Sequence, residues 1–519
     1  MIRTLLSARA PTVISVALGL LLSACVLPPT QTPAAQPLAS EHMGLTDVAV
    51  APAPEGWWKS FDDEQLNQLI ERAFSNSPSL AQASARLREA VSQADAAHAG
   101  LLPHATLDAT VMRQRAPENF IVPPPLAGSV FWTGVGGANL SWDLDFWGRQ
   151  ADALKQARAL AQASGYEIES ARLLLAGAIA QAYIDLYRDS ALADIAARAE
   201  AQRQHIIDIT RQRVAAGLDT QLELRTAEAQ LPQARVEHAQ AQAAVDLAIH
   251  QLAAISGDGA TAYATIQRPQ INLDAALPLP TALPINLLAR RPDVLAARLQ
   301  VDAADAQRLA ANAAFYPDIS LRALAGFGAF GLDHLFELSA RSYGGGAVVS
   351  LPLFDGGRLR AEYRGSEAVL DEAVAHYNQT VLQAVQQTAD QLTRIDALTR
   401  ERADQAQTLA ASEDAYRIAE ERYRAGLASY LSVLNAETQV LNARRSSVDI
   451  VANQVIARVT LLLALGGSFD PAASTAPPAT APTTPVATGA ATDSAAPANS
   501  PTSNSSTSNS STSNSSTSN

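Results

Sequence analysis

The sequence predicts an α+β membrane protein in which one unit, two β-strands followed by a very long helical hairpin, occurs twice in tandem. The first observation is self-similarity at an offset of 209 residues over most of the unit, which indicates a duplicated unit. The second is a set of four segments in which apolar and polar residues alternate over about ten positions, the length that a tilted strand needs to cross a bilayer. The third is a pair of alanine-rich helical arms, each spanning 68 positions from an arginine to a glycine.

The composition argues against several classes of protein and of binding site. The chain has 519 residues, of which 48% are hydrophobic and 17% charged, and its formal net charge is −13. This charged fraction lies below the roughly 25% of typical soluble domains. Without an excess of cations to neutralise phosphates, nucleic-acid binding is not expected. The single cysteine, Cys25, excludes an internal disulfide framework and a cysteine-based zinc site.

Residues 1–24 have the pattern of a secretory signal peptide. A basic start is followed by an apolar segment at 13–22, and small residues then precede Cys25. This junction resembles a bacterial lipobox, which implies cleavage before Cys25 and attachment of lipid to Cys25. An ordinary signal peptide with a chance cysteine is the alternative.

Residues after the signal predict where the mature chain is held. Residue 26 is Val rather than the Asp that often retains lipoproteins in the inner membrane, so lipid-anchored delivery to the outer membrane is expected. Residues 25–54, rich in Pro and Ala, are expected to form the lipid anchor and a flexible tether. No uninterrupted run of 18 apolar residues follows the signal, so no helix is expected to span a membrane. Any span would then consist of β-strands.

The internal repeat is clearest at two glycine turns. Residues 213–218 and 422–427 both read Arg-x-x-x-Gly-Leu. Further upstream the offset becomes 214, as between Pro103 and Pro317, so a loop five residues longer is expected in the first half. One unit has therefore been duplicated.

The repeat and the periodicities divide the chain into segments. These are the signal (1–24), the anchor and tether (25–54), the first repeat (55–257), a linker (258–285), the second repeat (286–467) and a tail (468–519) rich in Ser, Thr, Asn and Pro. The tail is expected to be disordered because its composition supplies no core. Strands are predicted at about 104–114 and 129–145 in the first repeat and about 317–328 and 342–354 in the second. A soluble antiparallel sheet is the alternative for these segments.

The helical arms predict long hairpins. The arms at 149–217 and 358–426 would each extend about 100 Å. Gly217 and Gly426 would close the hairpins, because a helix that ends in a left-handed residue favours glycine there. Pro232 should kink its helix locally. Apolar residues recur every seven positions and favour left-handed winding at Leu434, Leu441, Val448, Val455 and Leu462.

Together these features resemble the outer membrane factors, the TolC-like channels, and within them the lipoprotein branch of the NodT or OprM type. The lipobox at Cys25, the duplicated unit and the two Arg-x-x-x-Gly-Leu turns carry the resemblance. Residues 57–59, 291–294 and 314–321 also resemble motifs of that branch. The resemblance covers about residues 55–467.

The resemblance implies a homotrimer whose three chains, with four strands each, close a twelve-stranded transmembrane β-barrel continuous with a long periplasmic α-helical barrel. Closure would leave no unpaired strand edge in lipid. The linker 258–285 would belong to an equatorial belt. The implied function is a passive outer-membrane exit channel of a tripartite efflux pump, without enzyme activity, cofactor or metal. Small toxic compounds such as drugs would reach it from a periplasmic adaptor (a membrane fusion protein) and an inner-membrane transporter of the resistance–nodulation–division or major-facilitator type.

The resemblance also places functional residues at the hairpin tips. Gly217, Leu218, Gly426 and Leu427 would dock the adaptor, on top of the helix-capping role of the glycines.

Residues near the tips would form the periplasmic aperture. Many relatives place an aspartate nine residues after the second glycine, where this chain has Asn435, and Ser432 one turn earlier is also uncharged. Glu223 would supply an anionic ring instead, and Arg422 and Tyr423 would bond across protomers and hold the tip shut. A solvated helix face is the alternative for each.

Two other classes of protein compete with the channel. A lipid-anchored periplasmic coiled-coil scaffold or adhesin stalk needs no pair of alternating, bilayer-length hairpins at equivalent places. An envelope enzyme is disfavoured because the sequence contains no His-Glu-x-x-His motif, Gly-x-Ser-x-Gly elbow or phosphate-binding Walker loop.

Overall fold

The computed structural model describes residues 35–38, 54, 56–119, 123–274 and 290–469. The signal peptide, Cys25 and the tail from residue 470 lie outside the described residues. The helices are α2 (Glu64–Asn76), α3 (Pro78–Ala99), α4 (Arg149–Ala215), α5 (Gln221–Ile255), α6 (Pro292–Ala313), α7 (Arg358–Arg424) and α8 (Tyr430–Ala464), and the strands are β1 (His104–Arg115), β2 (Val130–Leu144), β3 (Asp318–Phe330) and β4 (Arg341–Ser350).

The two halves of the chain have the same order of elements. Each runs from one helix into two strands and then into a long helix and a shorter return helix, α3-β1-β2-α4-α5 and α6-β3-β4-α7-α8. The long helices have 67 residues each and the return helices 35 each. Strand β4 ends at Ser350, before the predicted end at 354, because Pro352 has no N–H to donate to a ladder.

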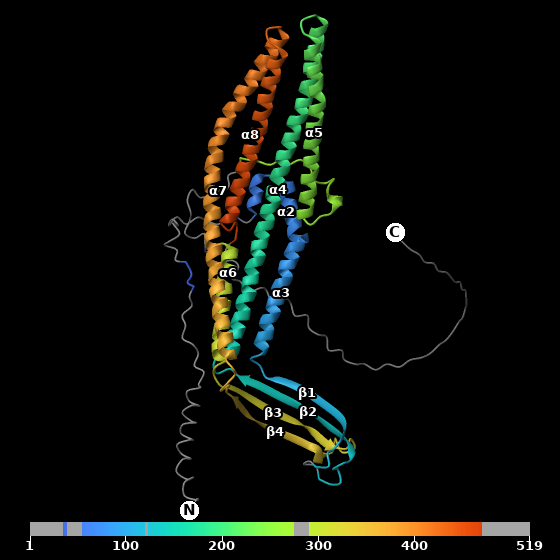
Figure 1. Ribbon diagram of the computed structural model, residues 1–519, viewed down its shortest axis with the longest axis vertical. Helices are drawn as coiled ribbons and strands as arrows, with labels where there is room; N and C mark the ends of the chain where they lie inside the picture. Colours follow the sequence, from blue (N-terminus) through green and yellow to red (C-terminus); the bar gives the residue numbers. More distant parts are fainter. Residues whose placement is uncertain (1–34, 39–53, 55, 120–122, 275–289, 470–519) are drawn as a thin grey trace, which may run out of the picture. The chain divides into compact units, whose positions relative to one another are not determined.

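Each long helix is accompanied by two shorter ones (Figure 1). Helix α3 lies along the part of α4 nearest the sheet, and α5 lies along the part nearest the tip. Helices α6 and α8 accompany α7 in the same way. With 1.5 Å per residue, α4 extends about 100 Å from the strands to the tip.

The main core lies midway along α4. Trp57, Trp58 and Phe61 of the short helix η2 (Trp57–Phe61) pack with apolar residues of α2, α4, α5 and α8. Asp63 caps α2 by accepting hydrogen bonds from two backbone amides, and its Oδ2 also accepts one from the Tyr183 hydroxyl at 2.8 Å. The described part of the linker, 258–274, joins this core. The short helix η2 and the described part of the linker therefore pack into the same core.

The four strands form one antiparallel sheet in the order β1-β2-β3-β4. The register places Leu107, Ala138, Ala325 and Tyr343 in one row on the same face. The opposite face carries polar groups, including Asn139, whose amide donates to Asp108 at 2.7 Å. Leu107 is 83% exposed and Tyr343 is 79% exposed. An exposed apolar face opposite a polar face is the pattern of a strand set between lipid and water.

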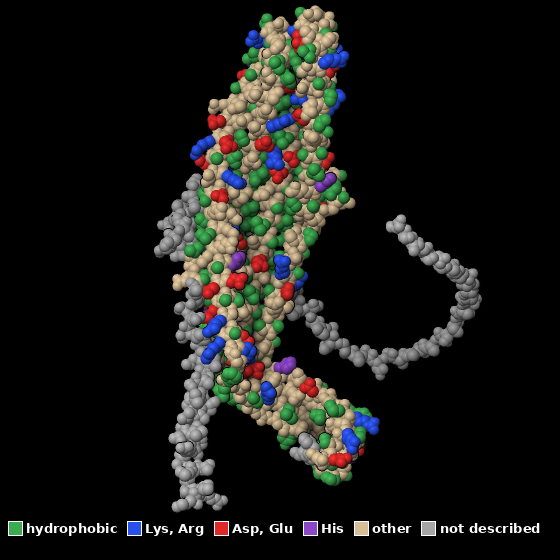
Figure 2. Space-filling view, in the orientation of Figure 1, with side chains coloured by type: hydrophobic (Ala, Val, Ile, Leu, Met, Phe, Trp, Pro, Cys, Tyr) green, Lys and Arg blue, Asp and Glu red, His purple; other side chains and the backbone are tan. Residues whose placement is uncertain are grey.

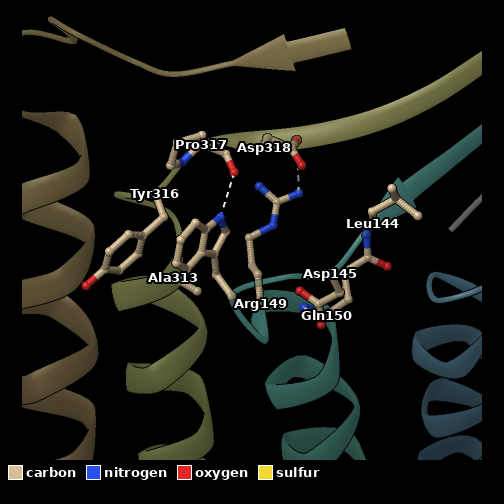
Figure 3. Close-up of a pocket in the computed structure, with 9 residues that line it drawn as sticks. Leu144, Asp145, Arg149, Gln150, Ala313, Tyr316, Pro317 and Asp318 are labelled. Carbon is tan, nitrogen blue, oxygen red and sulfur yellow. Dashed lines mark hydrogen bonds and ion pairs between the residues drawn. The ribbon is translucent and has the colours of Figure 1, made fainter. Parts of the chain in front are cut away.

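Hydrogen bonds and a ring stack hold the junction between sheet and helices (Figure 3). Asp145 caps the start of α4 by accepting hydrogen bonds from the amides of Gln150 and Ala151, at 3.1 and 2.7 Å. The indole of Trp147 stacks on Tyr316 with ring centroids 4.8 Å apart and donates to the Pro317 carbonyl at 2.9 Å. Trp147 therefore packs between the two halves of the chain.

Helix α8 is more apolar than expected. An 18-residue window in it has a mean hydropathy of 1.5, long and apolar enough by length and composition to cross a membrane, although 44% of the window is buried. Its Val455, Val459 and Leu462 pack against α4 in the main core. Polar residues are interspersed along α8, so the helix is apolar on average without containing an uninterrupted apolar run of that length.

Four residues of the predicted flexible tether are held in place. Residues 35–38 have extended backbone and make hydrogen bonds to α7. This part of the tether therefore differs from the expectation, because side chains of α7 bind its backbone.

Candidate functional site at the hairpin tips

Both hairpin tips end in a glycine with left-handed backbone. Gly217 has φ 73° and Gly426 has φ 78°. The amide of Leu218 donates to the Arg213 carbonyl at 2.9 Å, and that of Leu427 donates to the Arg422 carbonyl at 2.8 Å. Each bond satisfies one of the free carbonyls at the end of its helix, α4 or α7, as in a Schellman cap. The helix-capping role expected of the two glycines is thereby accounted for.

Exposed leucines surround both turns. Leu218 and Leu427 are 64% and 70% exposed, and Leu222 and Leu431, four residues further on, are 74% and 62% exposed. The first pair was predicted as a docking surface, whereas the second pair was not. The signal for the second pair was present, because Leu222 and Leu431 occupy equivalent positions of the repeat. In the space-filling view the tip region carries apolar and basic side chains at its end (Figure 2).

A buried polar cluster fastens the two hairpins to each other. Asp219, just after the first turn, accepts hydrogen bonds at 2.7 Å from the Arg213 guanidinium and from the Tyr423 hydroxyl. Arg213 also donates to the Tyr423 carbonyl at 2.8 Å and lies over the Tyr423 ring at 4.7 Å. Thr210 shares a 2.9 Å hydrogen bond with the same hydroxyl. We call Thr210, Arg213, Asp219 and Tyr423 the tip clasp.

The surroundings of Asp219 in the clasp favour its charged carboxylate form. Burial alone would raise the pKa of Asp219, but hydrogen bonds from Arg213 and Tyr423 together hold that pKa below its ordinary value. Burial raises the pKa of Tyr423 to about 12, so its hydroxyl stays protonated and can donate. The side chains of Arg213 and Asp219 are only 10% and 11% exposed. The ion pair is therefore shielded from screening by salt.

Arg213 and Asp219 are not among the residues predicted from the sequence. Tyr423 was predicted to bond across protomers, but the structure buries Tyr423 completely and pairs its hydroxyl within its own chain. The available signal was a departure from the repeat, because the position equivalent to Asp219 is Ala428. An acid present in one half alone indicates a contact that the repeat does not require.

The other predicted aperture residues lie near the tips with different surroundings. Glu223 is half-buried and accepts a hydrogen bond from the Thr220 amide at 3.1 Å, completing a capping box for α5. Ser432 is exposed, and its hydroxyl lies 3.3 Å from that of Ser429. Arg422 and Asn435 are exposed. Asn435 lines a shallow groove between α7 and α8 with small side chains such as Ala411 and Ala415.

A second buried ion pair lies further from the tips. Arg203 of α4 approaches Glu437 of α8 with Nε and Oε1 3.4 Å apart, and the two side chains are 11% and 4% exposed. Arg203 also donates to the Gln230 carbonyl at 3.2 Å, close to Pro232 inside α5. Burial raises the pKa of Glu437, although the charge of Arg203 opposes the shift.

Replacing Glu437 with glutamine is expected to flatten the pH dependence of stability. The folded state binds the Glu437 proton more tightly than the unfolded state, so the free energy of unfolding falls as pH rises from the ordinary pKa through the raised one. Melting temperatures of the detergent-solubilised protein from acidic to neutral pH measure this. Over this pH range the melting temperature of wild type should fall more than that of E437Q. Glu421→Gln, at an exposed site of α7, should behave as wild type. Parallel curves for wild type and E437Q would contradict the assignment.

Comparison with known proteins agrees with this geometry. The family model described as outer membrane efflux protein matches residues 69–258 and 283–467. The multidrug resistance outer membrane protein MdtP of Shigella flexneri is 32% identical over 469 residues, covering 87% of this chain and 95% of the relative. The fusaric acid resistance protein FusA of Burkholderia cepacia is 38% identical over 317 residues, covering 60% of this chain and 59% of the relative.

Solved structures show the same fold. The crystal structure of the outer membrane protein VceC from Vibrio cholerae has a TM-score of 0.76 at 35% identity, covering 81% of this chain and all of that one. The outer-membrane channel OprN has a TM-score of 0.74 at 27% identity, covering 85% and 99%. The predicted four-stranded sheet in each chain is confirmed, and so is the fold of an outer-membrane channel with long helical hairpins. The chain belongs to the outer membrane efflux protein family and is an efflux channel of the outer membrane.

Proposed function

We propose that this protein is the passive exit duct of a tripartite pump that expels small toxic organic compounds, including drugs. The observation that carries the proposal is the pair of exposed Gly-Leu turns about 100 Å from the lipid-facing sheet. A periplasmic adaptor would dock on these turns and connect the duct to an inner-membrane transporter of the resistance–nodulation–division or major-facilitator type. The names of MdtP and FusA, which refer to multidrug and fusaric acid resistance, support this substrate class.

The open edges of the sheet indicate how several chains would close a pore. In the described part of the chain, β1 and β4 each have one edge without a partner strand. An open edge in lipid leaves backbone amides and carbonyls unsatisfied, at a cost of several kcal/mol for each group. Three chains joined edge to edge would form a closed barrel of twelve strands. Cys25 would carry the lipid anchor of each chain.

The test combines assembly with conduction. Light scattering and negative-stain imaging of the detergent-solubilised protein should give a trimeric tube, and planar bilayers should give channel conductance. The gene should also restore dye efflux to cells that lack their own outer-membrane efflux channel but retain pump and adaptor. A monomer, or a thin rod without conductance, would overturn the duct and favour an anchored scaffold.

A further inference from the structure

The N-terminal segment 35–38 binds α7 through its backbone. The amide of Ala35 donates to Asp371 Oδ1 at 3.0 Å, and the amide of Leu38 donates to Asn378 Oδ1 at 2.9 Å. The Asn378 amide donates in turn to the Gln36 carbonyl at 3.0 Å. The side chain of Ala35 packs on a small apolar cluster, formed by Ala304, Leu370 and Val374.

The spacing of the two α7 side chains matches an extended chain. Asp371 and Asn378 are seven positions apart, two turns of the same helix face, which is about 10.5 Å along the axis. Ala35 and Leu38 are three residues apart, which is about 10 Å in an extended chain. Two acceptors at this spacing therefore meet two amides of an extended strand. Because the hydrogen bonds involve only the backbone of the segment, they suit a tether of Pro and Ala, which offers few polar side chains.

We propose that Asp371 and Asn378 form a backbone clamp that holds the tether on α7 and directs the lipid anchor toward the membrane. The segment runs parallel to α7, with Ala35 nearer than Leu38 to the start of this helix, where the strands join it. Asp371 lies 13 positions, or about 20 Å, from Arg358 at that start. Cys25 and Ala35 are ten positions apart, a stretch of chain that can reach at most about 35 Å. The directing role rests on the proposed lipid at Cys25, whereas the clamp itself does not.

Hydrogen–deuterium exchange of the full-length protein in detergent tests the clamp. Exchange of the amides of Ala35 and Leu38 should be slowed in wild type. In the Asp371→Ala, Asn378→Ala double variant it should accelerate about tenfold or more, since each amide loses one hydrogen bond. Asp371→Asn keeps an acceptor and should retain protection at Ala35. Glu372→Ala, at the adjacent exposed position, should leave both amides protected. Unprotected amides in wild type, or equal exchange in the double variant, would overturn the clamp.

Two further measurements separate the clamp from the lipid. The intact mass of the same wild-type sample reports whether Cys25 carries lipid. Protection in a sample without lipid would support the clamp and refute the proposed anchor. In Cys25→Ser the amides should remain protected, because the clamp is made by α7 alone. Protection that disappears in Cys25→Ser would overturn the clamp, since the anchor would then be what holds the segment.

Discussion

Replacing Asp219 with alanine is expected to loosen the periplasmic tip and increase the open fraction of the channel about tenfold to a hundredfold. The substitution removes the hydrogen bonds from Arg213 and Tyr423 to the carboxylate and leaves a largely buried guanidinium without its counter-ion. Hydrogen bonds to charged groups contribute about 1.5–3 kcal/mol, which corresponds to this change in population. Conductance of single channels in planar bilayers measures it directly.

Matched variants test whether the clasp, rather than general destabilisation, sets the result. Tyr423→Phe removes one hydrogen bond from Asp219 and should have a smaller effect in the same direction. Asp208→Ala removes an exposed pair with Arg211 near the same tip and should leave conductance unchanged. Because the pKa of Asp219 is lowered, the clasp should persist until pH falls below the ordinary range of an aspartate. Wild-type conductance in D219A would refute a gating role for the clasp.

Replacing Leu218 and Leu427 together with serine is expected to abolish efflux without closing the channel. Each leucine is more than 60% exposed and would bury its side chain only against a partner. Full burial of a leucine contributes about 1.5–3 kcal/mol, and a trimer would lose six such contacts at once. Drug susceptibility of cells and co-purification of the adaptor measure the effect.

Two controls accompany this double variant. Conductance in planar bilayers should match wild type, because the clasp and the sheet are untouched. Replacing both leucines with methionine, of similar volume and polarity, should preserve most of the efflux. Normal drug resistance with the double serine variant would show that the adaptor docks elsewhere.

Much of the fold was predictable because it depends on periodic patterns. Alternation located β1 at 104–114, and the structure has it at 104–115. The glycines at 217 and 426 predicted the ends of α4 and α7 because left-handed backbone favours glycine. The repeat, with an offset of 214 residues at β1 and 209 at the glycine turns, then constrained each assignment twice.

The features that could not be predicted depend on contacts that produce no periodic pattern in the sequence. Asp219 and Tyr423 are 204 positions apart, and only the folded chain shows that the tyrosine faces inward. The clamp on α7 binds backbone, so residues 35–38 carry no recognisable motif. Helical periodicity made Asp371 and Asn378 indistinguishable from other polar residues of a solvated face. The cross-protomer role of Arg422 and the places of Glu223, Ser432 and Asn435 in the aperture stay predictions.

Within the residues that the structure describes, β1 and β4 each leave one edge without a partner strand, and this affects how the channel is assembled. If neither edge can be sealed within its own chain, a single subunit has no stable state inside the bilayer. Insertion and association then become one kinetic event, and its rate should rise more steeply than linearly with subunit concentration. Subunits waiting in the periplasm would be the species most exposed to proteolysis and edge-to-edge aggregation. The cell would therefore control the amount of functional channel by the supply of unassembled subunits rather than by dissociation of finished trimers.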